Sequence, residues 1–107
     1  MDEIIQVLEH ERNAIISITH RLSLSDSLAQ VAEESAELAQ AALKLRRCID
    51  GTNPTPTSLH DASDAFNEEL ADVLLSAYVA GFDDGAVARV VKRKIARWNE
   101  RLRANEK

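Results

Sequence analysis

Two short acidic segments of the sequence share one pattern of residue types. Residues 33–37 read EESAE and residues 68–72 read EELAD, so the acids of the first segment recur 35 positions later. Carboxylates are the ligands that hard cations such as Mg²⁺ and Mn²⁺ prefer, and a pair of such ions suits phosphoryl chemistry. The acids concerned are Glu33, Glu34, Glu37, Glu68, Glu69 and Asp72.

The helical phase of these acids relates them to the core. At about 100° per residue, Glu34 and Glu37 lie roughly 60° apart, and Glu34 borders an apolar stripe through Leu38. Glu69 and Asp72 border the apolar stripe of their own segment in the same way. Four carboxylates at a seam between two helices would repel each other unless cations neutralised them. The pattern therefore leaves two interpretations open, a metal site between the helices and a solvated acidic surface made of good helix formers.

Four helical segments are expected to position these acids. Apolar residues recur at helical spacing through each segment, and no run of alternating strands is present. Pro54 and Pro56 make residues 51–58 a loop that lets the second and third helices pack side by side and antiparallel. The sequence thus predicts one all-α domain over residues 1–107.

The ends of these helices carry recognisable signals. A Ser or Asp can cap the start of a helix, and a Gly past its end can stop it. The first helix is expected from about Asp2 to Leu22. The second should begin at Ser25 or Asp26 and stop at Gly51, the third at Ser58 or Asp61 and stop at Gly81, and the fourth at Asp83 or Asp84.

Charge and composition exclude several classes of protein. The net charge is −5, but residues 89–107 hold eight basic and two acidic side chains. Such a split does not suit long nucleic acid, which needs a broad basic surface, although a basic helix can bring phosphates to an acidic centre. The single cysteine, Cys48, fits a reducing compartment. With an acidic N-terminus and no apolar run of about 20 residues, a cytoplasmic protein without a membrane segment is expected.

The order EExxE, spacer, ExxD resembles the MazG-like all-α nucleotide pyrophosphohydrolases. The resemblance covers roughly residues 28–102, with QVAEESAELAQAALKLRR at 30–47, GTNPTP at 51–56, EELADVLL at 68–75 and KIARWNERL at 94–102. It implies a four-helix MazG-like bundle whose second and third helices carry the metal site. It also implies a homodimer or a dimer of dimers (homotetramer).

The resemblance also implies a role for individual residues. Trp98 departs from the family, many members of which have Asn there, and it is interpreted as a core or subunit-contact residue. Lys44 is a further phosphate-binding candidate, with a solvated charge as the alternative. The implied roles are Mg²⁺ binding for Glu34, Glu37, Glu69 and Asp72, water orientation or deprotonation for Glu33, and triphosphate binding for Lys94 and Arg101.

The implied reaction is hydrolysis of a nucleoside triphosphate between the α and β phosphates, with Mg²⁺ as cofactor and Mn²⁺ as a substitute. Electrostatic stabilisation by metal and basic side chains should dominate it. The alternatives are a phosphoribosyl-ATP pyrophosphohydrolase, a relative of the dimeric dUTPases, and a non-enzymatic helical module that binds a cation or a basic partner. The motifs leave the base and sugar preference open.

Overall fold

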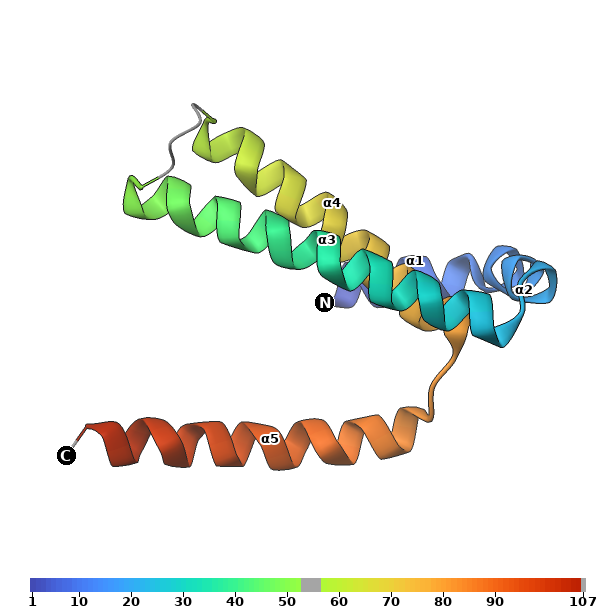
Figure 1. The fold of residues 1–107 in the computed structure, drawn as a ribbon. Coiled ribbons are helices and arrows are strands. Elements are labelled where there is room, and N and C mark those ends of the chain that lie inside the picture. The colour runs from blue at the N-terminus through green and yellow to red at the C-terminus, as the bar shows by residue number, and fades with distance from the viewer. Residues whose placement is uncertain (53–56, 107) are drawn as a thin grey trace.

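The computed structural model describes residues 1–52 and 57–106, which form five α-helices and no strand (Figure 1). The predicted all-α fold is confirmed. Part of the predicted loop, residues 53–56, lies outside the described residues. None of the helices in the described ranges is long and apolar enough to cross a membrane. The helices are α1 (Asp2–His10), α2 (Arg12–Arg21), α3 (Leu24–Asp50), α4 (Leu59–Ala80) and α5 (Asp84–Asn105).

Side-chain caps define the starts of the three long helices. Ser58 and Asp83 each accept a hydrogen bond of 3.0 Å from the backbone N–H three residues ahead. Both residues were predicted as caps. The predicted cap of α3 at Ser25 or Asp26 is wrong, because Ser23 takes this role and accepts from the Asp26 N–H. Ser23 has an extended backbone, so its hydroxyl can reach the free N–H groups of the first turn. The helix therefore begins earlier than predicted.

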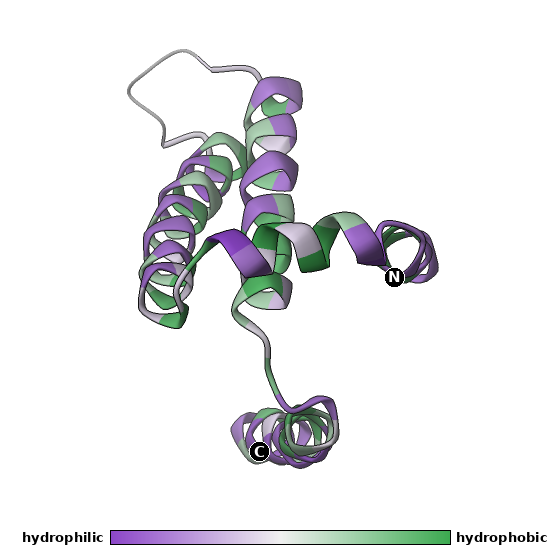
Figure 2. Ribbon diagram, turned by 90° about the vertical axis from the view of Figure 1, so that its right-hand side faces the viewer, coloured by the Kyte–Doolittle hydropathy of each residue, from purple (hydrophilic) through white to green (hydrophobic). Residues whose placement is uncertain are grey.

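The predicted first helix is divided at Glu11, so the expectation of one helix from Asp2 to Leu22 is wrong. The backbone of Glu11 has φ −95° and ψ 17°, and α1 and α2 leave it in different directions (Figures 1 and 2). No glycine or proline marks this break in the sequence. The reason lies in packing: after the bend, the Thr19 hydroxyl of α2 comes within 3.5 Å of the Val79 carbonyl of α4.

The α3 and α4 helices pack along each other and form the centre of the chain. Gly51 follows α3 with φ 72°, a left-handed conformation that glycine adopts without a steric penalty. The end of α3 and the start of α4 lie at the same end of the pair (Figure 1). Ala62 and Val79 are the buried apolar residues of the described chain, and both belong to α4. The core of one chain is therefore small.

The α5 helix lies apart from the rest of the chain in both views (Figures 1 and 2). Within the described residues, the helix pairs in contact are α3 with α4, α2 with α4 and α1 with α2. Gly81 ends α4 as predicted. The three residues 81–83 connect α4 to α5. A single chain therefore does not form the predicted four-helix bundle, which stays a prediction.

Candidate metal centre

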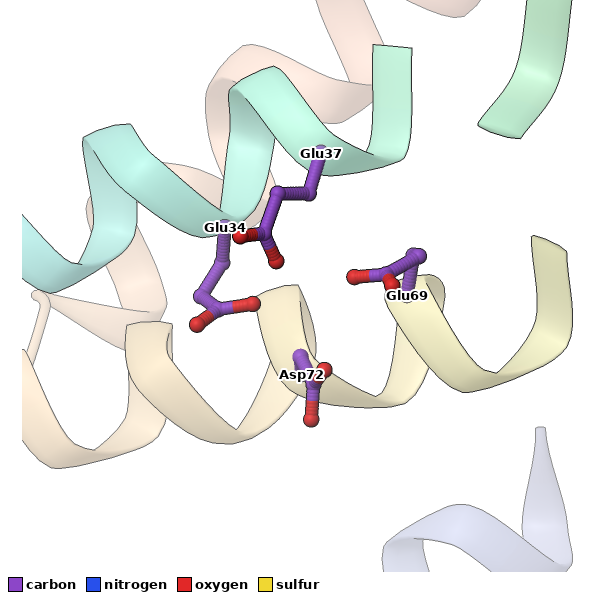
Figure 3. Close-up of side chains that lie close together, drawn as sticks. All are labelled: Glu34, Glu37, Glu69 and Asp72. Atoms are coloured by element: carbon purple, nitrogen blue, oxygen red, sulfur yellow. The ribbon is translucent and has the colours of Figure 1, made fainter. Parts of the chain in front are cut away.

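Four carboxylates from α3 and α4 converge at one point of the helix pair. One oxygen from each of Glu34, Glu37, Glu69 and Asp72 lies within 4.8 Å of the oxygens from the other three. Figure 3 shows that Glu34 and Glu37 reach from α3 toward Glu69 and Asp72 on α4. The two acidic segments thus meet because each helix carries its pair of acids, one turn apart, on the side that faces the other helix.

The spread of these oxygens suits a cation. Oxygens on opposite sides of a Mg²⁺ ion are about 4.2 Å apart, since each Mg–O distance is about 2.1 Å. A spread of up to 4.8 Å therefore needs small side-chain movements around one ion, or it can accommodate two ions roughly 3.5–4 Å apart. Two divalent cations would neutralise all four carboxylates. The donor set consists of oxygen only, which favours hard cations over Zn²⁺ or Cu²⁺.

Two oxygens of the cluster are buried without a partner. Oε2 of Glu34 and Oε2 of Glu69 are inaccessible to solvent, and neither has a hydrogen-bond donor among the described residues. Glu37 and Asp72 are exposed. A buried carboxylate oxygen without a donor costs free energy unless a cation or proton compensates it. This observation sets the cluster apart from an ordinary solvated acidic surface and fits a cation between the helices.

The electrostatics at Glu34 agree with this interpretation. Burial, together with the negative charges of Glu37 and Asp72, raises the pKa of Glu34 above its usual 4.5. Gln30 acts in the opposite direction, because its Nε2 donates to Oε1 of Glu34 at 2.6 Å. A hydrogen bond to the ionised form lowers the pKa of an acid. Glu34 is thus held in place by one oxygen while the other is buried and unpartnered.

The remaining candidates on α3 lie outside the four-carboxylate cluster. Glu33 precedes Glu34 and is exposed. Lys44 is also exposed, two turns beyond Glu37 along the same helix. Glu33 therefore stands beside the cluster with a carboxylate in solvent, and Lys44 faces solvent further along α3.

The basic candidates lie on a different helix, away from the cluster. Lys94 and Arg101 belong to α5, where they border a hollow of about 150 Å³ together with Arg97 and Trp98. Because α5 contacts no other helix in the described part of the chain, neither basic residue reaches the carboxylates of its own chain. The structure thus brings the four predicted metal ligands together and leaves the two predicted phosphate ligands apart.

Gln30 was not among the residues predicted from the sequence. It lies one turn before Glu34, and a glutamine four residues before an acid on a helix is a recognisable pairing signal. That spacing alone would have pointed to Gln30 as the residue that holds Glu34.

Comparisons with family models, curated proteins and solved structures give no match to this chain. A chemical interpretation of the acidic cluster therefore depends on the geometry and burial of its own residues.

Proposed function

We propose that the protein is a Mg²⁺-dependent nucleoside triphosphate pyrophosphohydrolase of the MazG-like kind. It would hydrolyse the bond between the α and β phosphates and release a nucleoside monophosphate and pyrophosphate. The observation that carries the proposal is the meeting of four carboxylates with two buried, unpartnered oxygens. An oxygen-only site for hard cations between two helices is suited to phosphoryl transfer.

Glu34, Glu37, Glu69 and Asp72 would hold Mg²⁺, with Mn²⁺ as a substitute. The cation would supply electrostatic stabilisation of the charge that develops on the phosphate oxygens. Glu33, exposed beside the cluster, would orient the attacking water and accept its proton.

Lys94 and Arg101 would neutralise the triphosphate, with Lys44 as a weaker third contact. Because the transition state of phosphoryl transfer spreads charge over the phosphate oxygens, such cations act by position and charge.

We propose a homodimer or a dimer of dimers, in which Lys94 and Arg101 of one chain meet the carboxylates of another. The chain exposes 8665 Å² of surface, whereas a compact monomer of this size exposes about 5,900 Å². Its radius of gyration is 17.1 Å, compared with about 13 Å for a compact domain of this length. Part of this exposed surface is an apolar stripe on α5, where Val87, Val91, Ile95, Trp98 and Leu102 are all more than two-fifths exposed.

The apolar and basic residues of α5 share one side of the helix. At about 100° per residue, Lys94 and Arg101 fall within roughly 40° of Val87 and next to the apolar stripe. A second chain that covers the stripe therefore meets both basic side chains. With a partner's α5 beside α3 and α4, three helices of the predicted four-helix bundle would come from two chains. The acidic cluster of one chain and the basic edge of the other have complementary charge.

A direct assay tests the proposal. The protein is incubated with Mg²⁺ and a panel of ribo- and deoxyribonucleoside triphosphates, and the products are separated by ion-exchange chromatography. Monophosphate with pyrophosphate is the expected pair of products, and omission of the divalent cation should abolish it. Asp64→Asn, an exposed acid two turns before Asp72 on α4, is the matched control and should stay active.

Two outcomes would contradict the proposal. Diphosphate with inorganic phosphate as products would show cleavage at the wrong bond. Absence of turnover in a protein that still binds Mg²⁺ would indicate a cation-binding helical module instead of this enzyme.

A further inference from the structure

A small pocket opens directly beside the acidic cluster. Four apolar side chains, Ile18 and Leu22 from the α2 region and Leu75 and Val79 from α4, form its walls. Glu34 and Asp72 belong both to this pocket and to the carboxylate cluster. A molecule whose phosphates lie at the cluster can therefore place its other end in the pocket.

The size of the pocket limits what it can hold. Its volume is about 180 Å³. An apolar cavity of about 150 Å³ is known to take up one benzene molecule, so this pocket has room for a single six-membered ring. The fused double ring of a purine would have to leave part of its surface outside. The walls are apolar, as the faces of a heteroaromatic ring require.

Two polar side chains in the pocket can recognise the edge of such a ring. Ser27 is only 4% exposed, and among the hydrogen bonds of the described residues none involves its hydroxyl. The nearby buried Ser76 differs, because its hydroxyl donates to the Val73 carbonyl at 3.0 Å. Gln30 uses one N–H on Glu34 and keeps a second N–H and a carbonyl oxygen. The Ser27 hydroxyl therefore keeps both its donor and its acceptor capacity for a ligand that enters the pocket.

We propose that this pocket binds the base of a pyrimidine nucleotide and makes the enzyme selective for pyrimidine over purine triphosphates. The inference depends on the proposed function, since the acidic cluster must hold the phosphates of the same molecule. Ser27 and Gln30 are its specificity-determining residues. They would pair with the donors and acceptors on the edge of the ring, while Val79 and Leu75 contact its face.

The experiment compares kcat/KM for cytidine, uridine, thymidine, adenosine and guanosine triphosphates in the presence of Mg²⁺. Pyrimidines should be preferred by at least about tenfold, the effect of one well-placed hydrogen bond or a poorly fitting ring. Ser27→Ala and Gln30→Leu should each reduce the ratio of pyrimidine to purine kcat/KM by about tenfold. The ratio is the diagnostic quantity because Gln30 also holds Glu34, and a disturbed Glu34 would slow all substrates alike. Gln40→Leu, an exposed glutamine further along α3, is the control and should leave the ratio unchanged.

A binding measurement separates this inference from the proposed function. Saturation-transfer NMR with the five nucleoside 5′-monophosphates and Mg²⁺ should detect cytidine, uridine and thymidine monophosphates bound more tightly than the purine ones. Turnover of all triphosphates with equal efficiency would overturn the pyrimidine inference and leave the proposed function standing. Selective binding of pyrimidine monophosphates without any turnover would support the pocket and overturn the reaction. Unselective binding, or a ratio unaffected by both variants, would also overturn the inference.

Discussion

Gln30 and Glu34 form a pair in which one oxygen of the carboxylate is hydrogen-bonded and the other is buried without a partner. The Gln30 amide donates to Oε1 at 2.6 Å, while Oε2 is buried and has no donor among the described residues. The hydrogen bond orients the carboxylate, and the charges of Glu37 and Asp72 act against its ionisation. In the absence of a cation, this arrangement should therefore weaken the fold.

Replacing Glu34 by Gln should raise the melting temperature of the metal-free protein by a few degrees. The amide keeps a hydrogen-bond acceptor for Gln30 and removes a partly buried negative charge from the cluster. Differential scanning calorimetry in EDTA measures the change, with Glu68→Gln, an exposed acid on α4, as the control. Addition of Mg²⁺ should stabilise the unchanged protein more than the variant. Equal melting temperatures in EDTA would contradict this view of the cluster.

The difference in melting temperature between Glu34→Gln and the unchanged protein should depend on pH. The pKa of Glu34 is raised in the folded state, so the unfolded chain loses this proton first as the pH rises. The destabilisation by Glu34 is thus absent below the usual pKa of 4.5, grows between 4.5 and the raised pKa of the folded state, and is fully present above it. Calorimetry of both proteins from pH 4 to pH 8 in EDTA should show the gap widening. A gap that is constant over this range would rule out titration of Glu34 as its source.

Glu37→Gln and Asp72→Asn should each reduce Mg²⁺-dependent turnover by at least about 100-fold, because each removes a charged ligand from the cluster. The helical circular dichroism spectrum should be nearly unchanged, since both side chains are exposed. Steady-state release of pyrophosphate gives the measurement, and Asp64→Asn serves as control. Full activity in either variant would remove these residues from the site.

Lys94→Ala should raise KM by about tenfold and change kcat much less, because the proposed contact of this cation with the phosphates would be equally strong in the substrate and in the transition state. The control is Lys92→Ala, whose side chain lies roughly 160° away from Lys94 around α5. Initial rates over a range of substrate concentrations separate the two constants. An unchanged KM would count against a phosphate role for Lys94.

Ile95→Asp should convert the assembly to monomers, because it places a charge in the middle of the exposed apolar stripe of α5. Ala96→Asp puts the same charge on the other side of the helix and should leave the assembly intact. Sedimentation velocity distinguishes the two results. A monomeric unchanged protein would contradict the proposed dimer and the source of Lys94 and Arg101.

The sequence predicted the local features well because their causes are local. Ser58, Gly51 and Gly81 act on adjacent turns, and the repeated acids could be assigned to facing helices from their helical phase together with the predicted loop between the two helices. The break at Glu11 has no glycine or proline to mark it and follows from contacts with α4.

The pocket at Ser27 was equally invisible in the sequence. A serine on a helix has no distinguishing pattern, and the pocket that Ser27 lines forms only when α2 and α4 bring Ile18 and Val79 to the same place. The separation of α5 could not be predicted either, since an amphipathic helix looks the same whether its own chain or a second chain covers it.

The separation of α5 has a genetic consequence. If carboxylates and basic side chains of one site come from two chains, a chain inactivated at Asp72 and a chain with weakened substrate binding at Lys94 can restore one intact site between them. Mixing the two variants, or expressing both alleles in one cell, would then recover activity at substrate concentrations too low for the Lys94 variant alone. The two halves of the chemistry would behave as separate complementation groups although a single reading frame encodes them.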